Sequence, residues 1–96
     1  MTTTTTALKT SVLERFLRYV TVDTQSAENS STYPSTLKQL VLLDQLVTEL
    51  KQIGLADAVR DEHGYVMATI PPTSKKKVPV IGFLAHVDTS PEMSGA

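Results

Sequence analysis

The residues best placed to do chemistry are an imidazole and a carboxylate two positions apart, His86 and Asp88. In extended backbone, residues i and i+2 point to the same side, so the two side chains are predicted to meet. Neutral imidazole is a common zinc ligand, and a carboxylate on its other ring nitrogen fixes the tautomer and strengthens the ligand. The same geometry suits a His–Asp proton relay. A histidine satisfied by a neighbouring carboxylate, without further function, is the remaining alternative.

The pair follows the most apolar stretch of the chain, Val80 to His86, which contains no charged residue and is preceded by Pro79. A short run of this kind, with a β-branched start and bounding proline, is typical of a strand. A strand that is apolar on both faces belongs in the interior of a covered sheet. Ligands in open α/β sheets bind at the carboxyl ends of strands. We therefore expect a central apolar strand that delivers His86 and Asp88 to a ligand-binding edge.

Two helices are predicted before this strand. Residues 1–7 include five consecutive threonines and are expected to form a disordered tail. The first helix should begin between Ala7 and Ser11, because Ser11 and Glu14 have the spacing of a capping box. Apolar residues then recur at helical spacing and are expected to face a core: Leu13, Phe16, Leu17 and Val20.

The second helix is predicted to start at Pro34-Ser35, with Ser35 as N-cap, and to end at Gly54 in a left-handed C-cap. Leucines at steps of three and four residues mark it as scaffold. Between the helices, residues 21–35 read as a polar loop. Its acids Asp23 and Glu28 are expected to be solvated, although either could approach a metal site.

A β-hairpin should follow, with strands at Leu55–Arg60 and Tyr65–Ile70 joined by a turn at Glu62-His63-Gly64. A histidine in such a turn is expected to be exposed and not to bind metal. The connector from Pro71 to Pro79 is too short for a parallel crossover, which normally takes a dozen or more residues. The predicted fold is therefore α/β, with two helices, a hairpin and a central apolar strand in a mixed sheet.

Composition excludes several classes of function. The 96 residues form one domain at most, and the net charge of −1 favours neither a nucleic-acid partner nor a membrane partner. The absence of cysteine excludes disulfides, thiolate metal sites and a cysteine nucleophile. Lys75–Lys77 lack a glycine-rich cradle and are read as a solvated loop, not a phosphate site. No signal peptide or membrane span is apparent, so a cytoplasmic protein is expected.

Beyond these patterns, the chain resembles a known family. The stretch Gly82–Pro91 is similar to the first metal motif of the peptidase T family of aminotripeptidases, a branch of the co-catalytic zinc metallopeptidases. Leu13–Val20 and Asp23–Ser26 resemble that family's opening helix and loop, and Tyr65–Pro71 resembles its second strand. The likeness extends from about Leu8 to Gly95.

The resemblance implies that His86 binds one of two zinc ions and that Asp88 steadies the site without being a ligand. It also implies an enzyme that releases the N-terminal residue of tripeptides, with its other metal ligands and general base further along a longer chain. Residues 8–96 are then expected to be the N-terminal, incomplete portion of the catalytic domain, inactive without the remainder as partner. The alternative is a small α/β module that associates with itself or a partner without catalysis.

Overall fold

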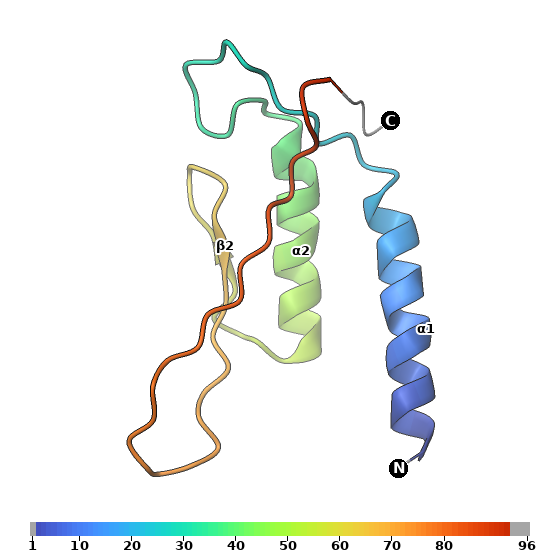
Figure 1. The fold of residues 1–96 in the computed structure, drawn as a ribbon, viewed down its shortest axis with the longest axis vertical. Helices are drawn as coiled ribbons and strands as arrows, with labels where there is room; N and C mark the ends of the chain where they lie inside the picture. The colour runs from blue at the N-terminus through green and yellow to red at the C-terminus, as the bar shows by residue number, and fades with distance from the viewer. Residues whose placement is uncertain (1, 93–96) are drawn as a thin grey trace.

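The structure is a computed structural model that describes the backbone of residues 2–92 and the side chains of residues 11–92. Its elements, in order, are α1 (Thr2–Tyr19), α2 (Gln39–Ile53), β1 (Val59–Arg60) and β2 (Val66–Met67). The two helices run side by side, with the hairpin beside α2 and a long trace crossing in front of it (Figure 1). The radius of gyration is 15.9 Å, whereas a compact chain of this length is expected to have about 12.5 Å.

Helix α1 starts earlier than the sequence predicts, at Thr2 instead of between Ala7 and Ser11. Ser11 does not act as an N-cap, because it lies inside the helix and accepts a hydrogen bond from the Arg15 guanidinium one turn later. The subdivision into a tail at residues 1–7 and a partial domain at residues 8–96 stays a prediction. The expected core face of the first helix is also wrong, since its four predicted side chains are between 49% and 60% exposed: Leu13, Phe16, Leu17 and Val20.

The start of α2 also differs from the prediction. The helix begins at Gln39, its N-cap position is Lys38, and no side chain caps it. Ser35 is not the cap because its hydroxyl accepts hydrogen bonds from the Ala27 backbone N–H at 3.0 Å and from the Gln39 side-chain amide at 3.2 Å. The predicted end is confirmed, since Gly54 has φ of 118° and its N–H bonds the carbonyls of Leu50 and Lys51.

The predicted hairpin is confirmed, although its strands are shorter than expected. Val59 pairs with Met67 and Arg60 with Val66 in antiparallel register. Asp61 organises the turn by accepting bonds on its carboxylate from the N–H groups of His63 and Tyr65, at 3.0 and 2.9 Å. Gly64 has φ of 90°, which an L side chain rarely adopts.

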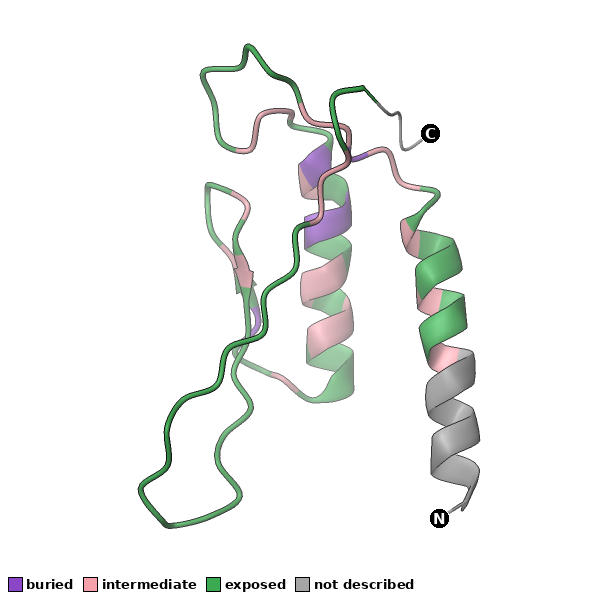
Figure 2. Cartoon of the chain, in the orientation of Figure 1, coloured by how far each residue is buried: buried purple, intermediate pink, exposed green. Residues whose placement is uncertain are grey.

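The core is small and lies between the upper half of α2 and the hairpin. Its buried apolar residues are Leu42, Leu43 and Ala58, and Figure 2 shows burial concentrated in the first turns of α2. The chain exposes 8072 Å², against about 5,400 Å² expected for a compact monomer of this mass. Many large apolar side chains of residues 12–84 are among the exposed ones.

The predicted central strand is not part of a sheet in this structure, and no mixed sheet forms among residues 2–92. Residues 78–86 run as an open trace that is mostly exposed (Figure 2). A strand needs a neighbour, and the hairpin supplies none beyond its own two strands. No helix in the described part of the chain is long and apolar enough to span a bilayer.

A polar cluster joins the two helices. The Glu49 carboxylate on α2 accepts hydrogen bonds from Tyr19 Oη and from the Arg18 guanidinium of α1, and Arg15 Nε lies 3.8 Å from Glu49 Oε1. Burial together with the hydrogen bond to Glu49 raises the pKa of Tyr19 to about 12. Burial acts to raise the pKa of Glu49, but the hydrogen bonds from Tyr19 and Arg18 outweigh it and leave that pKa below its usual value.

The cluster predicts that the packing of α1 on α2 is lost at both extremes of pH. Stability from Glu49 is fully present above its ordinary pKa of 4.5 and is lost as the pH falls through the lower folded value. Stability from Tyr19 is fully present below its ordinary pKa of 10.0 and is lost as the pH rises toward about 12. In urea unfolding, Glu49→Gln should lower the free energy of unfolding by about 1 kcal/mol at neutral pH. The further fall of that free energy as the pH is lowered should be smaller in the variant than in the unmodified chain.

Glu14→Gln is the matched control, because Glu14 is an exposed glutamate of α1. It should leave both the neutral stability and the acid limb unchanged. Equal effects of the two substitutions would mean that the cluster around Glu49 does not hold the helices together.

Candidate functional site

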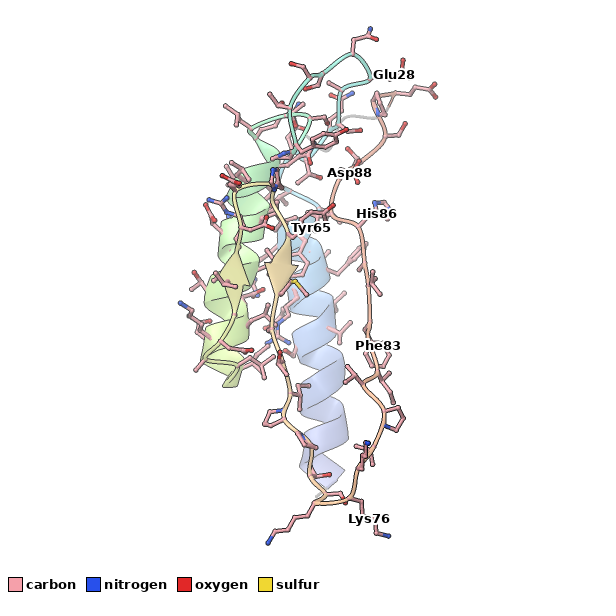
Figure 3. The ribbon with its side chains drawn as sticks, turned by 90° about the vertical axis from the view of Figure 1, so that its left-hand side faces the viewer. Glu28, Tyr65, Lys76, Phe83, His86 and Asp88 are labelled. Carbon is pink, nitrogen blue, oxygen red and sulfur yellow. The ribbon has the colours of Figure 1, made fainter. Side chains whose placement is uncertain are left out.

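The two residues singled out by their spacing meet in the structure. His86 Nδ1 lies 3.1 Å from Asp88 Oδ1 and 3.0 Å from the Asp88 carbonyl oxygen. Both side chains lie close together where the open trace reaches the top of the molecule (Figure 3). The predicted geometry, with the imidazole and the carboxylate on one side of the chain, is therefore observed.

This contact has a chemical consequence for the ring. Both acceptors face Nδ1, so the neutral ring is favoured in the tautomer that carries its proton there. Nε2 makes no hydrogen bond within residues 11–92, and the His86 side chain is 85% exposed against 40% for Asp88. An unprotonated nitrogen that faces solvent is what a metal ligand requires.

A complete metal site is not present among the described residues. No group of three or more His, Asp or Glu side chains comes together in that part of the chain, whereas a catalytic zinc site normally takes three protein ligands. The Asp23 carboxylate bonds the Gln25 N–H and Lys38 Nζ, both at 3.0 Å, and Glu28 is exposed on its loop. His63 is also exposed in the hairpin turn, as predicted. The residues present fit one zinc ligand with its orienting carboxylate.

A loop far away in the sequence holds the backbone on both sides of Asp88. Gln25 and Thr89 form an isolated parallel bridge, in which the Ser26 N–H donates to the Thr89 carbonyl at 3.0 Å and the Thr89 N–H donates to the Thr24 carbonyl at 3.2 Å. We call this pairing of residues 24–26 with residues 87–91 the clasp. It is what attaches the open trace to the fold at this end.

Side chains of the loop strengthen the clasp. Thr24 Oγ1 donates to the Val87 carbonyl at 3.0 Å, and Ser26 Oγ donates to the Thr89 carbonyl at 2.8 Å. Thr24 is only 2% exposed, so its hydroxyl bond is shielded from water. Sequence reasoning gave this loop no structural role, although its run of hydroxyl and amide side chains was the signal available.

The clasp is anchored in turn to the start of α2. Thr36 Oγ1 donates to the Gln25 carbonyl at 2.8 Å, and the Gln39 amide, which is buried, donates to Thr36 Oγ1 at 3.0 Å. Lys38 pairs with Asp23 at 3.0 Å. A continuous set of hydrogen bonds thus runs from the first turn of α2 through the loop to the backbone beside His86 and Asp88.

Removing one hydroxyl should loosen the clasp. Thr24→Val keeps the shape of the side chain but leaves the Val87 carbonyl without this donor. This should lower the free energy of unfolding by about 1–3 kcal/mol. The exchange of the Thr89 and Ser26 amide protons, measured by NMR, should become at least tenfold faster. Thr69→Val is the control, because Thr69 is exposed and only its backbone N–H is bonded. Unchanged exchange in Thr24→Val would show that the hydroxyl does not hold the segment.

Comparison with known proteins identifies a family. No family model matches the chain. The chain is 56% identical to peptidase T of Bacillus licheniformis over 88 residues, which cover 92% of this chain and 22% of that protein. It is 60% identical to peptidase T of Clostridium acetobutylicum over 84 residues (88% and 21%), and 57% identical to peptidase T of Bacillus subtilis over 88 residues (92% and 22%). The chain spans about a fifth of the length of these relatives, and it belongs to the peptidase T family.

Proposed function

We propose that this chain supplies one metal ligand and its orienting carboxylate to a zinc-dependent aminotripeptidase, an enzyme that releases the N-terminal residue of tripeptides. One observation carries the proposal. His86 Nδ1 is turned onto Asp88 while Nε2 faces solvent, and this occurs within a chain more than half identical to peptidase T. The identity covers most of the chain, so it includes far more than the His-x-Asp spacing.

In this proposal the residues of the chain divide the work. Asp88 accepts the Nδ1 proton of His86, which fixes the ring and makes Nε2 the better donor. His86 Nε2 would hold one of two zinc ions, which when bound polarise the scissile carbonyl and activate water. The clasp keeps the backbone carbonyls of Val87 and Thr89 bonded, so the segment that carries both residues does not rotate freely.

The remaining parts of the site are proposed to come from the rest of a longer catalytic domain. These parts are the other zinc ligands, the general base and the residues that bind the peptide. The same remainder would supply neighbours for residues 80–86, which would then form the central strand of a mixed sheet. By itself the chain is expected to be inactive, and a cytoplasmic location stays a prediction.

A second candidate function is a module that associates with itself. The observation in its favour is the exposure of Val80, Phe83 and Leu84, each at least 95% accessible to solvent. Soluble monomers rarely expose apolar groups so completely in one run.

A chimera tests the proposed enzyme directly. This chain would replace the matched 88 residues of Bacillus subtilis peptidase T, and hydrolysis of a tripeptide would be measured with zinc present. We expect activity within about tenfold of the parent, because the two sequences agree at 57% of positions. His86→Ala should abolish it, and Asp88→Asn should lower zinc affinity or activity about 10–100-fold.

His63→Ala in the same chimera is the matched control, since His63 is the second histidine of the chain and lies in the hairpin turn. Its activity should be unchanged. A folded chimera in which His86→Ala retains full activity would refute the assignment of His86 as a zinc ligand.

The isolated chain should bind zinc weakly, because no three ligating side chains come together within residues 11–92. Calorimetric titration of the 96-residue chain should give no binding in the micromolar range. Binding that is micromolar or tighter would mean that the chain assembles a site of its own.

A further inference from the structure

One buried residue of the clasp makes hydrogen bonds on both sides of Asp88. Thr24 is 2% exposed, the lowest value among residues 11–92. Its hydroxyl donates to the Val87 carbonyl at 3.0 Å, and its own carbonyl accepts the Thr89 N–H at 3.2 Å. These two partners belong to the peptide group that precedes Asp88 and to the one that follows it. Thr24 therefore holds both of the peptide planes that meet at the Asp88 Cα.

The second of these peptide groups also faces the imidazole. Its carbonyl oxygen, which belongs to Asp88, lies 3.0 Å from His86 Nδ1. Its N–H, which belongs to Thr89, is bonded to Thr24. In a planar trans peptide the N–H and the carbonyl point in opposite directions. One rigid group thus joins the buried loop on one side to the histidine ring on the other, and hydrogen bonds in such a series polarise one another.

The carboxylate of Asp88 depends on the same anchoring. Its Oδ1 lies 3.1 Å from His86 Nδ1. The direction of its Cα–Cβ bond follows from the two flanking peptide planes, so rotation of either plane moves the carboxylate relative to the ring. Within residues 11–92 the Thr24 hydroxyl is the only hydrogen-bond donor to the Val87 carbonyl. Because Thr24 is buried, water does not compete freely for this bond.

We propose that Thr24 is a positioning residue: by bonding both peptide groups that flank Asp88, it orients that residue and, through it, the ring of His86 as a zinc ligand. The part of this inference that concerns zinc rests on the proposed function, whereas the effect on the ring concerns this chain alone. Thr24 touches neither metal nor substrate. A hydroxyl that merely stabilised the loop would change the stability of the chain and leave the ring as it is.

The neutral His86 ring in the 96-residue chain reports this effect without zinc or substrate. Long-range proton–nitrogen NMR correlation gives the ratio of the Nδ1-protonated to the Nε2-protonated tautomer. Thr24→Val should lower that ratio at least about threefold, because a hydrogen bond that fixes Asp88 is lost. Thr24→Ser keeps the hydroxyl and should give the ratio of the unmodified chain.

Ser26→Ala is the matched control. The Ser26 hydroxyl also donates from the loop to the clasp, at 2.8 Å to the Thr89 carbonyl. That carbonyl belongs to the next peptide group along the chain, and it keeps the Ser26 N–H as a donor at 3.0 Å. The tautomer ratio should therefore be unchanged. A ratio that Thr24→Val leaves unaltered, or that Ser26→Ala lowers equally, would overturn the proposal.

Thr24→Val should stay folded, because the apolar core between α2 and the hairpin does not include Thr24. The amide proton of Tyr65, bonded to the Asp61 carboxylate at 2.9 Å, should keep its chemical shift. A measurement on the unmodified chain decides the matter if the variant unfolds. Scalar coupling across the hydrogen bond from the Thr89 N–H to the Thr24 carbonyl should be detected, and its absence would refute the anchoring of Asp88.

The Bacillus subtilis chimera tests the consequence for zinc. Thr24→Val should weaken zinc binding, measured by competition with a chelator, roughly three- to tenfold, which is less than Asp88→Asn because Thr24 acts through Asp88. Thr24→Ser should restore the affinity, and KM for the tripeptide should be unchanged in both.

The two proposals fail in different ways. Unchanged zinc affinity of Thr24→Val, in a chimera that His86→Ala inactivates, would overturn the positioning role and leave the proposed function standing. A folded chimera that stays active with His86→Ala would instead refute the proposed function, and the tautomer ratio in the isolated chain would still decide whether Thr24 orients the ring.

Discussion

The described fold depends on the clasp, because it is the point where the C-terminal part of the chain is attached to the helices and hairpin. The apolar core consists of a few residues between α2 and the hairpin, and it does not reach residues 78–92. Two backbone hydrogen bonds and the hydroxyls of Thr24 and Ser26 hold that end in place. Without them, His86 and Asp88 would sit on a chain with no fixed relation to α2.

The clasp also brings together two motifs that lie 63 residues apart in the sequence. From the sequence alone, Asp23–Ser26 is part of a polar loop. In the structure this loop binds the backbone next to the histidine and the carboxylate, and α2 supports it through Thr36 and Gln39. A hydroxyl that is buried and bonded to a carbonyl stabilises its partner more than an exposed one does.

Local signals in the sequence predicted local structure well. The left-handed cap at Gly54, the hairpin turn before Gly64 and the approach of His86 to Asp88 all depend on residues close together in the chain. The start of α2 was misplaced because Ser35 bonds Ala27, which is a contact across the loop. Spacing alone does not reveal which of two available partners a hydroxyl will take.

The predictions that needed distant partners did worse. The faces of α1 and residues 78–85 have the composition of buried surfaces, yet both are exposed, because burial requires a second surface that residues 2–92 do not provide. Patterns therefore indicate what a segment is suited to contact, and only the fold shows whether that contact is made. The exposed surface, which is larger than that of a compact monomer of this mass, is consistent with this.

The account rests on the carboxylate of Asp88 fixing the ring of His86. Long-range proton–nitrogen NMR correlation on the neutral ring, in the chain with and without Asp88→Asn, tests this directly. The account predicts that Nδ1 carries the proton in the unmodified chain, with Nε2 unprotonated, and that this preference weakens in the variant. A ring that carries its proton on Nε2, or one whose tautomer ignores the substitution, would contradict it.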